Sequence, residues 1–165
     1  MSLSKIDKRK LITLIINELE QELNQAINAA NEAHAAAVDD QSVAETQYDT
    51  LAIEASYLAE GQSRRVQELQ AAINNYRTLV LVNFDDSKAI ALTALVQLYQ
   101  DNQQKHWFFI GPCAGGFRCE LANEKITVIT PQSPMGYSLL EKYPQDDVEV
   151  KIGSKVLIDY IHQVQ

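Results

Sequence analysis

Apolar residues recur at spacings of three and four along the first half of the chain, from Lys8 to about Thr78. This period places them on one face of a helix. Two stripes result, with a polar break at residues 38–43 between them. They consist of Leu11, Ile12, Ile15, Ile16, Leu19, Leu23, Ile27 and Ala30, and of Leu51, Ala55, Leu58, Val66, Leu69, Ile73 and Tyr76. The pattern predicts an antiparallel coiled-coil hairpin over residues 1–78, with an acidic tip near residues 38–49.

Three details refine the hairpin. Residues 1–60 contain neither Gly nor Pro, so arms of about 30 residues would reach about 45 Å at a rise of about 1.5 Å per residue. Ser42 and Glu45 have the spacing of a capping box, which predicts that Ser42 caps the second helix. Antiparallel pairing also predicts salt bridges from Glu18, Glu20 and Glu22 to Arg64 and Arg65.

The second half of the chain has a different composition. All four prolines and five of the six glycines follow Arg77, together with β-branched and aromatic runs. Strands are predicted at residues 89–99, 107–110, 117–121, 125–130, 148–152 and 155–161. Ser133 followed by Pro134 predicts the start of a short helix that runs to about Lys142. The fold class is therefore α+β, with a small antiparallel sheet domain over residues 79–165.

The formal charge of −8 and the pI near 4.8 argue against a protein that holds nucleic acid through its own phosphate contacts. A partner with a basic surface fits better. The cluster Lys5–Lys10 is either a solvated helix start or a contact for such a partner. We expect a cytoplasmic chain without a membrane segment, because no signal-peptide pattern or long apolar run is present. In that compartment Cys113 and Cys119 are expected to stay reduced.

The tip carries a concentration of carboxylates. Asp39, Asp40, Glu45 and Asp49 lie within eleven residues, and no Lys or Arg occurs between residues 32 and 64. Oxygen ligands alone suit a hard cation such as Mg²⁺. Solubility at an exposed end would select the same residues, so the pattern leaves both interpretations open.

The chain resembles a known family at several places. An N-terminal hairpin with an acidic tip precedes a sheet domain that contains Ser133-Pro134-Met135-Gly136, Leu139-Leu140 and the strand Val148-Glu149-Val150. This combination looks like the bacterial Gre transcript-cleavage factors. The resemblance implies an FKBP-like fold for the sheet domain and RNA polymerase as the partner. It also implies that Ser133, Pro134, Met135 and Gly136 belong to the polymerase-binding surface.

In that family the sheet domain docks at the mouth of the polymerase secondary channel and the hairpin enters it. Tip acids then hold a Mg²⁺ jointly with the polymerase, and backtracked RNA is hydrolysed in the polymerase active site. The resemblance thus implies an accessory factor that is not itself an enzyme, has no cofactor of its own, meets nascent RNA only indirectly and is monomeric.

The tip departs from the family's pattern of an acid, two residues and then Glu-Asn-x-Glu-Tyr. Alignment on Tyr48 puts Gln41 and Ala44 where acids are expected. The nearest acids are Asp40 and Glu45, each displaced by one position. They are the candidate catalytic and metal-binding residues, with Asp39 and Asp49 as alternates. The family function thus leaves two versions, a cleavage factor and a regulator that occupies the channel without cleavage.

Two alternative functions, one structural and one enzymatic, stay open. The hairpin can serve as a structural coiled coil that dimerises. The FKBP-like half suggests a prolyl isomerase, although fold does not imply function. Trp107, Phe108 and Phe109 are consecutive on a predicted strand, so they alternate faces and cannot all line one pocket.

Overall fold

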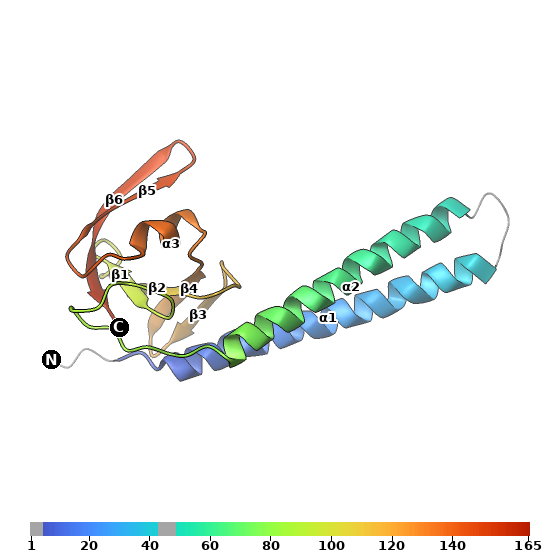
Figure 1. Cartoon of the computed structure of the whole chain (residues 1–165), viewed down its shortest axis with the longest axis horizontal. Helices are drawn as coiled ribbons and strands as arrows, with labels where there is room; N and C mark the ends of the chain where they lie inside the picture. The colour runs from blue at the N-terminus through green and yellow to red at the C-terminus, as the bar shows by residue number, and fades with distance from the viewer. Residues whose placement is uncertain (1–4, 43–48) are drawn as a thin grey trace. The chain divides into compact units, whose positions relative to one another are not determined.

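A computed structural model of the chain describes residues 5–42 and 49–165, with side chains at residues 5–37, 53–54 and 56–165 (Figure 1). The chain forms two compact units. One is the hairpin, Ile16–Arg77, and the other joins the segment up to Ile15 with Thr78–Gln165. The sequence predicts a single boundary at residues 78 and 79. The structure has a break there and adds the start of the chain to the sheet unit.

The hairpin unit consists of two long helices, α1 (Lys8–Ser42) and α2 (Asp49–Arg77). Its buried side chains in α1 become small toward the tip, from Leu19 to Ala26, Ala30, Ala33 and Ala37. Their spacing of four, three and four is the seam of a coiled coil, and small seam residues let two helices approach closely. The predicted hairpin is confirmed.

Two details of the predicted hairpin are wrong. The apolar period predicts Leu58 in the second stripe, but Leu58 is 57% exposed and the neighbouring Ala59 is buried at 1%. The larger side chain is excluded where the facing helix presents alanines. Ser42 does not cap the second helix either, because it is the last residue of α1 and α2 begins at Asp49. Without Gly or Pro, nothing in residues 38–42 ends the first helix. Glu45 lies outside the described residues.

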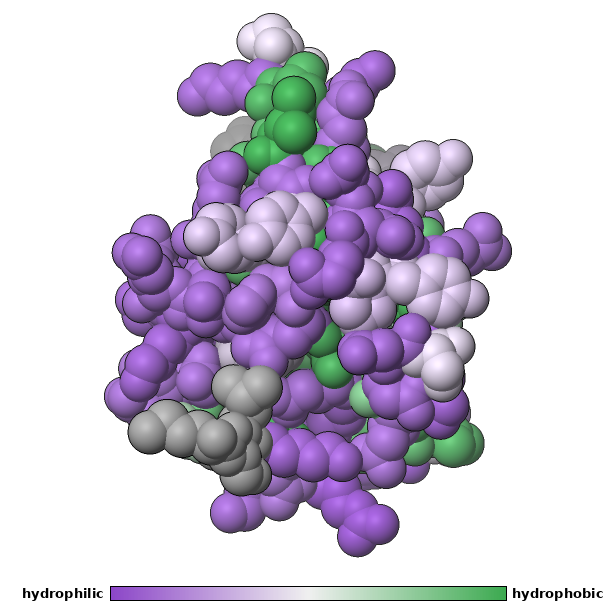
Figure 2. All heavy atoms as spheres, turned by 90° about the vertical axis from the view of Figure 1, so that its left-hand side faces the viewer, coloured by the Kyte–Doolittle hydropathy of each residue, from purple (hydrophilic) through white to green (hydrophobic). Residues whose placement is uncertain are grey.

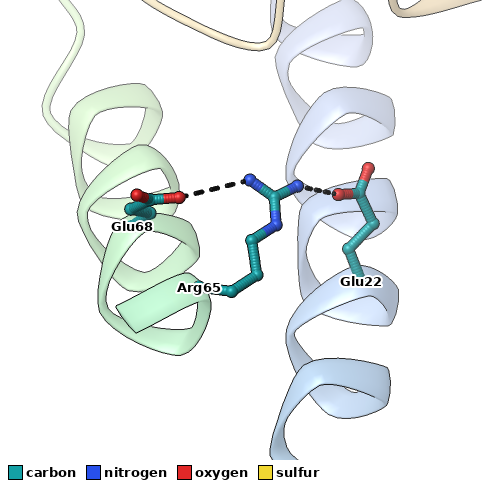
Figure 3. A network of polar contacts seen from close by, with 3 residues as sticks. All are labelled: Glu22, Arg65 and Glu68. Carbon is teal, nitrogen blue, oxygen red and sulfur yellow. Dashed lines mark hydrogen bonds and ion pairs between the residues drawn. The ribbon is translucent and has the colours of Figure 1, made fainter. Parts of the chain in front are cut away.

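The cross-arm salt bridges are partly as predicted. Arg65 Nη2 lies 2.8 Å from Glu22 Oε2, and Arg65 Nη1 lies 3.7 Å from Glu68 (Figure 3). Glu20 pairs with Arg77 at 2.6 Å, whereas Arg64 pairs with Glu60 within its own helix. These pairs are half-exposed, so each contributes at most about 1 kcal/mol and serves mainly to fix the register.

The described residues of the other unit form a six-stranded sheet in the order β3-β4-β2-β1-β6-β5. Its strands are β1 (Leu95–Leu98), β2 (His106–Ile110), β3 (Arg118–Leu121), β4 (Glu124–Ile129), β5 (Asp147–Ile152) and β6 (Lys155–Val164). All neighbours pair antiparallel except β2 and β4, which are parallel. The α+β fold is confirmed, and the one parallel pair corrects the expectation of a purely antiparallel sheet.

The parallel pair follows from where the chain turns. The tight Ala122-Asn123 turn, with φ of 54° and 62°, joins β3 to β4 as a hairpin. This hairpin inserts β4, not β3, next to β2, with Trp107 opposite Ile126 and Phe109 opposite Val128. Nothing in the alternation of a single strand specifies which hairpin member pairs with β2.

One face of the sheet is closed by the short helix α3 (Pro134–Leu139). Leu139 is fully buried among aliphatic side chains of β1, β2, β5 and β6, including Val96, Ile110, Val150 and Ile161. This cluster fixes α3 on the sheet, because apolar burial contributes about 25 cal/mol per Å².

Two predicted elements are shorter in the structure. The strand predicted at residues 89–99 begins only at Leu95, since Ala94 N donates to Ala91 O in a turn and Thr93 has φ 76°. The helix predicted to reach Lys142 ends at Leu139. Glu141 N donates to Ile90 O there, so the chain leaves the helix to pair with residue 90.

The basic start of α1 is anchored within the sheet unit. Lys8 is 8% exposed, its Nζ donates to Val82 O at 2.7 Å, and the same nitrogen lies 4.9 Å from the centre of the Phe84 ring. Lys5 donates to Asn83 at 3.1 Å. Lys8 is therefore a structural cation. Among the described residues, no helix has the length and apolarity needed to cross a bilayer.

Gly61 offers a test of the hairpin's local energetics. A Cβ added there meets no described atom within 4 Å, so Gly61→Ala is expected to stabilise the protein by about 1 kcal/mol through helix propensity. Urea unfolding followed by circular dichroism measures this. Gly153→Ala is the matched control, because it has equal space but φ +61° and should destabilise by about 1 kcal/mol. A loss of stability in Gly61→Ala would contradict the open environment.

Because Lys8 is buried, it makes the free energy of unfolding depend on pH. Desolvation, followed by the charge of Lys5, lowers the pKa of Lys8 from 10.5 to about 8. Between these pH values the unfolded chain holds the proton that the folded chain has lost. The free energy of unfolding contributed by Lys8 therefore rises from pH 8 to 10.5, by at most about 3 kcal/mol. Urea unfolding over this range should show the rise in wild type and in Lys10→Met, and not in Lys8→Met.

Candidate partner-binding site at the Ser133–Gly136 turn

The Ser133-Pro134-Met135-Gly136 segment forms the entry to α3. Ser133 is its N-cap, as predicted: the hydroxyl accepts a hydrogen bond from Gly136 N at 3.1 Å and donates to Thr130 O at 2.7 Å. Pro134 occupies the first helical position, where its missing N–H costs nothing. One hydroxyl thus ties the end of β4 to the start of the helix.

Gly136 is required by close packing. A Cβ at this position would lie 1.9 Å from Thr130 O and 2.8 Å from Thr130 C, which is backbone that cannot move aside. Met135 is partly buried and packs against the aliphatic core. Ser133, Met135 and Gly136 therefore build the turn, and Pro134 is the member of the four that is exposed.

The surface next to this turn has residues that the sequence did not single out. Tyr137 is 77% exposed, one helical turn after Pro134. A shallow cleft of about 360 Å³ lies between α3 and β5, lined by Pro134, Tyr137, Ser138, Glu149 and Lys151. The i to i+3 spacing of Pro134 and Tyr137 was the signal that could have identified Tyr137.

An apolar patch on β6 continues this surface. Val156 and Ile158 are 52% and 69% exposed, and they lie directly opposite Lys151 and Glu149 in the β5–β6 pair. Opposed residues of an antiparallel pair share a face. Figure 2 shows hydrophobic side chains gathered on this hairpin, at the top of the view. Apolar residues beside charged ones are typical of a protein-binding surface.

The candidate tip acids are placed by the backbone alone. Asp39 and Asp40 lie in the last turn of α1 and Asp49 is the first residue of α2, so the three belong to the same end of the hairpin. Their side chains, and Glu45 altogether, lie outside the described part of the chain. Among the described residues no group of three His, Cys, Asp or Glu side chains is arranged to hold a metal ion.

Other residues considered from the sequence are also placed. Trp107 and Phe109 are buried at 2% and 0%, whereas Phe108 packs on the face that carries α3. The aromatic run therefore does not line one pocket. Within the described chain no disulfide joins Cys113 and Cys119, and burial raises the pKa of the Cys119 thiol.

Comparisons with known proteins give a faint likeness. No protein-family profile matches the chain, and no curated protein matches it. The solved structures that do match include three of the transcription factor Gfh1. The first is 16% identical, with 90% of this chain and 92% of that chain covered and a TM-score of 0.35. The GreA factor homolog 1 of Thermus thermophilus is 14% identical, with 91% of this chain and 94% of that chain covered and a TM-score of 0.28. Gfh1 of Thermus aquaticus is 17% identical, with 90% of this chain and 92% of that chain covered and a TM-score of 0.33. Superpositions this loose establish neither a family nor a function.

The turn makes a graded stability prediction. Ser133→Ala removes the cap and should destabilise by about 1 kcal/mol. Gly136→Ala forces a methyl group into Thr130 O and should cost more than about 2 kcal/mol. Urea unfolding followed by Trp107 fluorescence gives both values. Tyr137→Ser, on the exposed side of the same helix, is the control and should stay within about 0.5 kcal/mol. Equal effects for the two turn variants would show that the close contact relaxes.

Proposed function

We propose that this protein is a transcription factor that binds bacterial RNA polymerase, with the sheet unit docked at the mouth of the secondary channel and the hairpin inside it. The observation that carries the proposal is the Ser133–Gly136 turn, whose residues resemble the Gre signature and which presents Pro134 and Tyr137 at an exposed cleft. A two-helix hairpin on the same chain supplies an element that can enter a channel.

The docking surface consists of Pro134 and Tyr137 on α3, Glu149 and Lys151 on β5, and Val156 and Ile158 on β6. Its exposed tyrosine and aliphatic residues are suited to the dry centre of an interface, and its charged pair to the rim. The acidic chain, with a net charge of −8, fits a partner with a basic surface.

The tip would hold Mg²⁺ through Asp40 and Glu45, with Asp39 and Asp49 as alternates. The donor set fits the ion, because carboxylate oxygens are the ligands that Mg²⁺ takes. When bound beside a phosphodiester, such an ion activates water and stabilises developing charge. The carboxylates of this chain would only hold and place the ion, and the reaction itself would belong to the polymerase.

Backtracked elongation complexes of a bacterial RNA polymerase test the proposal. The full-length protein, with Mg²⁺ present, should bind these complexes, and gel analysis of the RNA shows whether it is shortened. Tyr137→Ser and Ile158→Ser should each weaken binding about tenfold, the usual cost of losing a central apolar contact. Val80→Ser, at an exposed apolar residue outside the docking surface, should bind as wild type does.

The tip variants separate the two versions of the function. Asp40→Ala and Glu45→Ala should abolish RNA shortening while binding is kept, and Glu32→Ala, an exposed acid of α1 away from the tip, should change neither. Binding without shortening in wild type identifies a regulator that occupies the channel. Failure to bind refutes the proposal, and a light-scattering mass of twice the monomer would then favour a structural coiled-coil dimer.

A further inference from the structure

A second cleft lies on the outer strands of the sheet, away from the docking surface. It is formed by β2, β3 and β4, opens to solvent and has a volume of about 360 Å³. Its polar lining residues are Gln104, His106, Arg118, Glu120, Lys125 and Thr127. Neither the Gre resemblance nor the proposed function gives these residues a role.

The strand register gathers them on one face. Arg118 lies directly opposite Thr127, and Glu120 directly opposite Lys125, across the antiparallel β3–β4 pair. His106 lies beside Lys125 in the parallel β2–β4 pair. Opposed residues of neighbouring strands have Cβ atoms about 5 Å apart. Two cations, a carboxylate, an imidazole and a hydroxyl therefore share one small area of the sheet.

The two cations are exposed and are not joined to carboxylates in the part of the chain that the structure describes. In the described part of the chain, neither the Arg118 nor the Lys125 side chain has an ion pair within 4.0 Å, although Glu120 is next to Lys125. By contrast, Arg65 and Arg77 of the hairpin are both bound to carboxylates. Arg118 and Lys125 are thus two exposed cations on one face of the sheet, with Glu120 as the carboxylate in the same lining.

Behind the cations, His106 and Thr127 are fixed in place. His106 Nε2 and Thr127 Oγ1 are 2.8 Å apart, and Asp101 Oδ1 lies 3.8 Å from His106 Nδ1 on the other side of the ring. The ring also packs on Phe108 with centroids 4.6 Å apart. The imidazole is thus held from three sides with both nitrogens facing partners, so it positions Thr127 and leaves no free ring N–H for a ligand.

We propose that this cleft binds the phosphate group of a small organic phosphate monoester. The Arg118 guanidinium and the Lys125 ammonium together offer charged donors that suit the oxygens of a phosphate. The cleft of about 360 Å³ has room for a small organic group beside the phosphate. A nucleic acid chain is disfavoured, because the rest of the surface is acidic.

A nuclear magnetic resonance titration of the full-length protein, in phosphate-free buffer of low ionic strength, tests this site. Ribose 5-phosphate and adenosine monophosphate should saturate and shift the amide signals of Arg118, Lys125 and Thr127. Inorganic phosphate should bind the same residues more weakly, and ribose should not bind. Equal affinity for the two organic phosphates assigns recognition to the phosphate and sugar, and tighter binding of the nucleotide assigns part of it to the base.

Charge variants make the test specific to the cleft. Arg118→Gln and Lys125→Gln should each weaken binding about tenfold, because a hydrogen bond to a charged group is lost. Glu120→Gln should strengthen binding, since it removes the one carboxylate in the lining. Lys155→Gln makes the same charge change on β6, outside the cleft, and should leave the affinity unchanged.

Three results would overturn the site. They are the absence of saturable shifts at these residues with either organic phosphate, an equal loss of affinity in Lys155→Gln, and an unchanged affinity in Glu120→Gln. The dispersion of the spectra shows that each variant is folded. No polymerase is present in this experiment, so its outcome is independent of the proposed function.

Discussion

The close approach of Gly136 to Thr130 is the constraint on which the partner-binding surface depends. Thr130 O receives the Ser133 hydroxyl and backbone N–H, and it occupies the place that any other side chain at residue 136 would need. With the start of α3 fixed in this way, Leu139 reaches the core and Tyr137 points to solvent. The apolar cluster beneath the helix and the exposed cleft beside it are two consequences of a single turn.

Features decided by local chemistry could be predicted from the sequence. The Ser-Pro cap of α3, the apolar period of the hairpin and most strands are fixed by residues close in the chain. The parallel pairing of β2 and β4, the turn at Thr93 and the early end of α3 at residue 139 depend on partners far away in the sequence. Leu58 shows the same limit, because only the alanines of the facing helix decide that Ala59 takes the seam position.

The candidate sites also contain some residues that local sequence identifies and others that only the folded chain brings together. Ser133 was recognisable from its capping chemistry and Gly136 from the resemblance to the Gre signature. Tyr137, Glu149 and Lys151 became neighbours only when β5 was placed beside α3. Likewise Arg118, Lys125 and His106 belong to three different strands, and their common face requires the sheet order. Such a surface cannot be predicted from a motif in one segment, since each of its residues alone looks like any solvent-exposed residue of a strand.

Electrostatics gives the two surfaces of the sheet unit different roles. The docking surface combines aliphatic and aromatic side chains with one pair of opposite charge, so it gains from excluding water over a broad area. The β2–β4 cleft has two exposed cations beside the carboxylate of Glu120, and these cations gain from one compact anion and little from a flat protein surface. Arg118 and Lys125 are exposed, so water solvates them when no ligand is bound, and a small anion would replace that water with charge-assisted hydrogen bonds. This arrangement suits a small, highly charged anion in the β2–β4 cleft and a macromolecule on the docking surface.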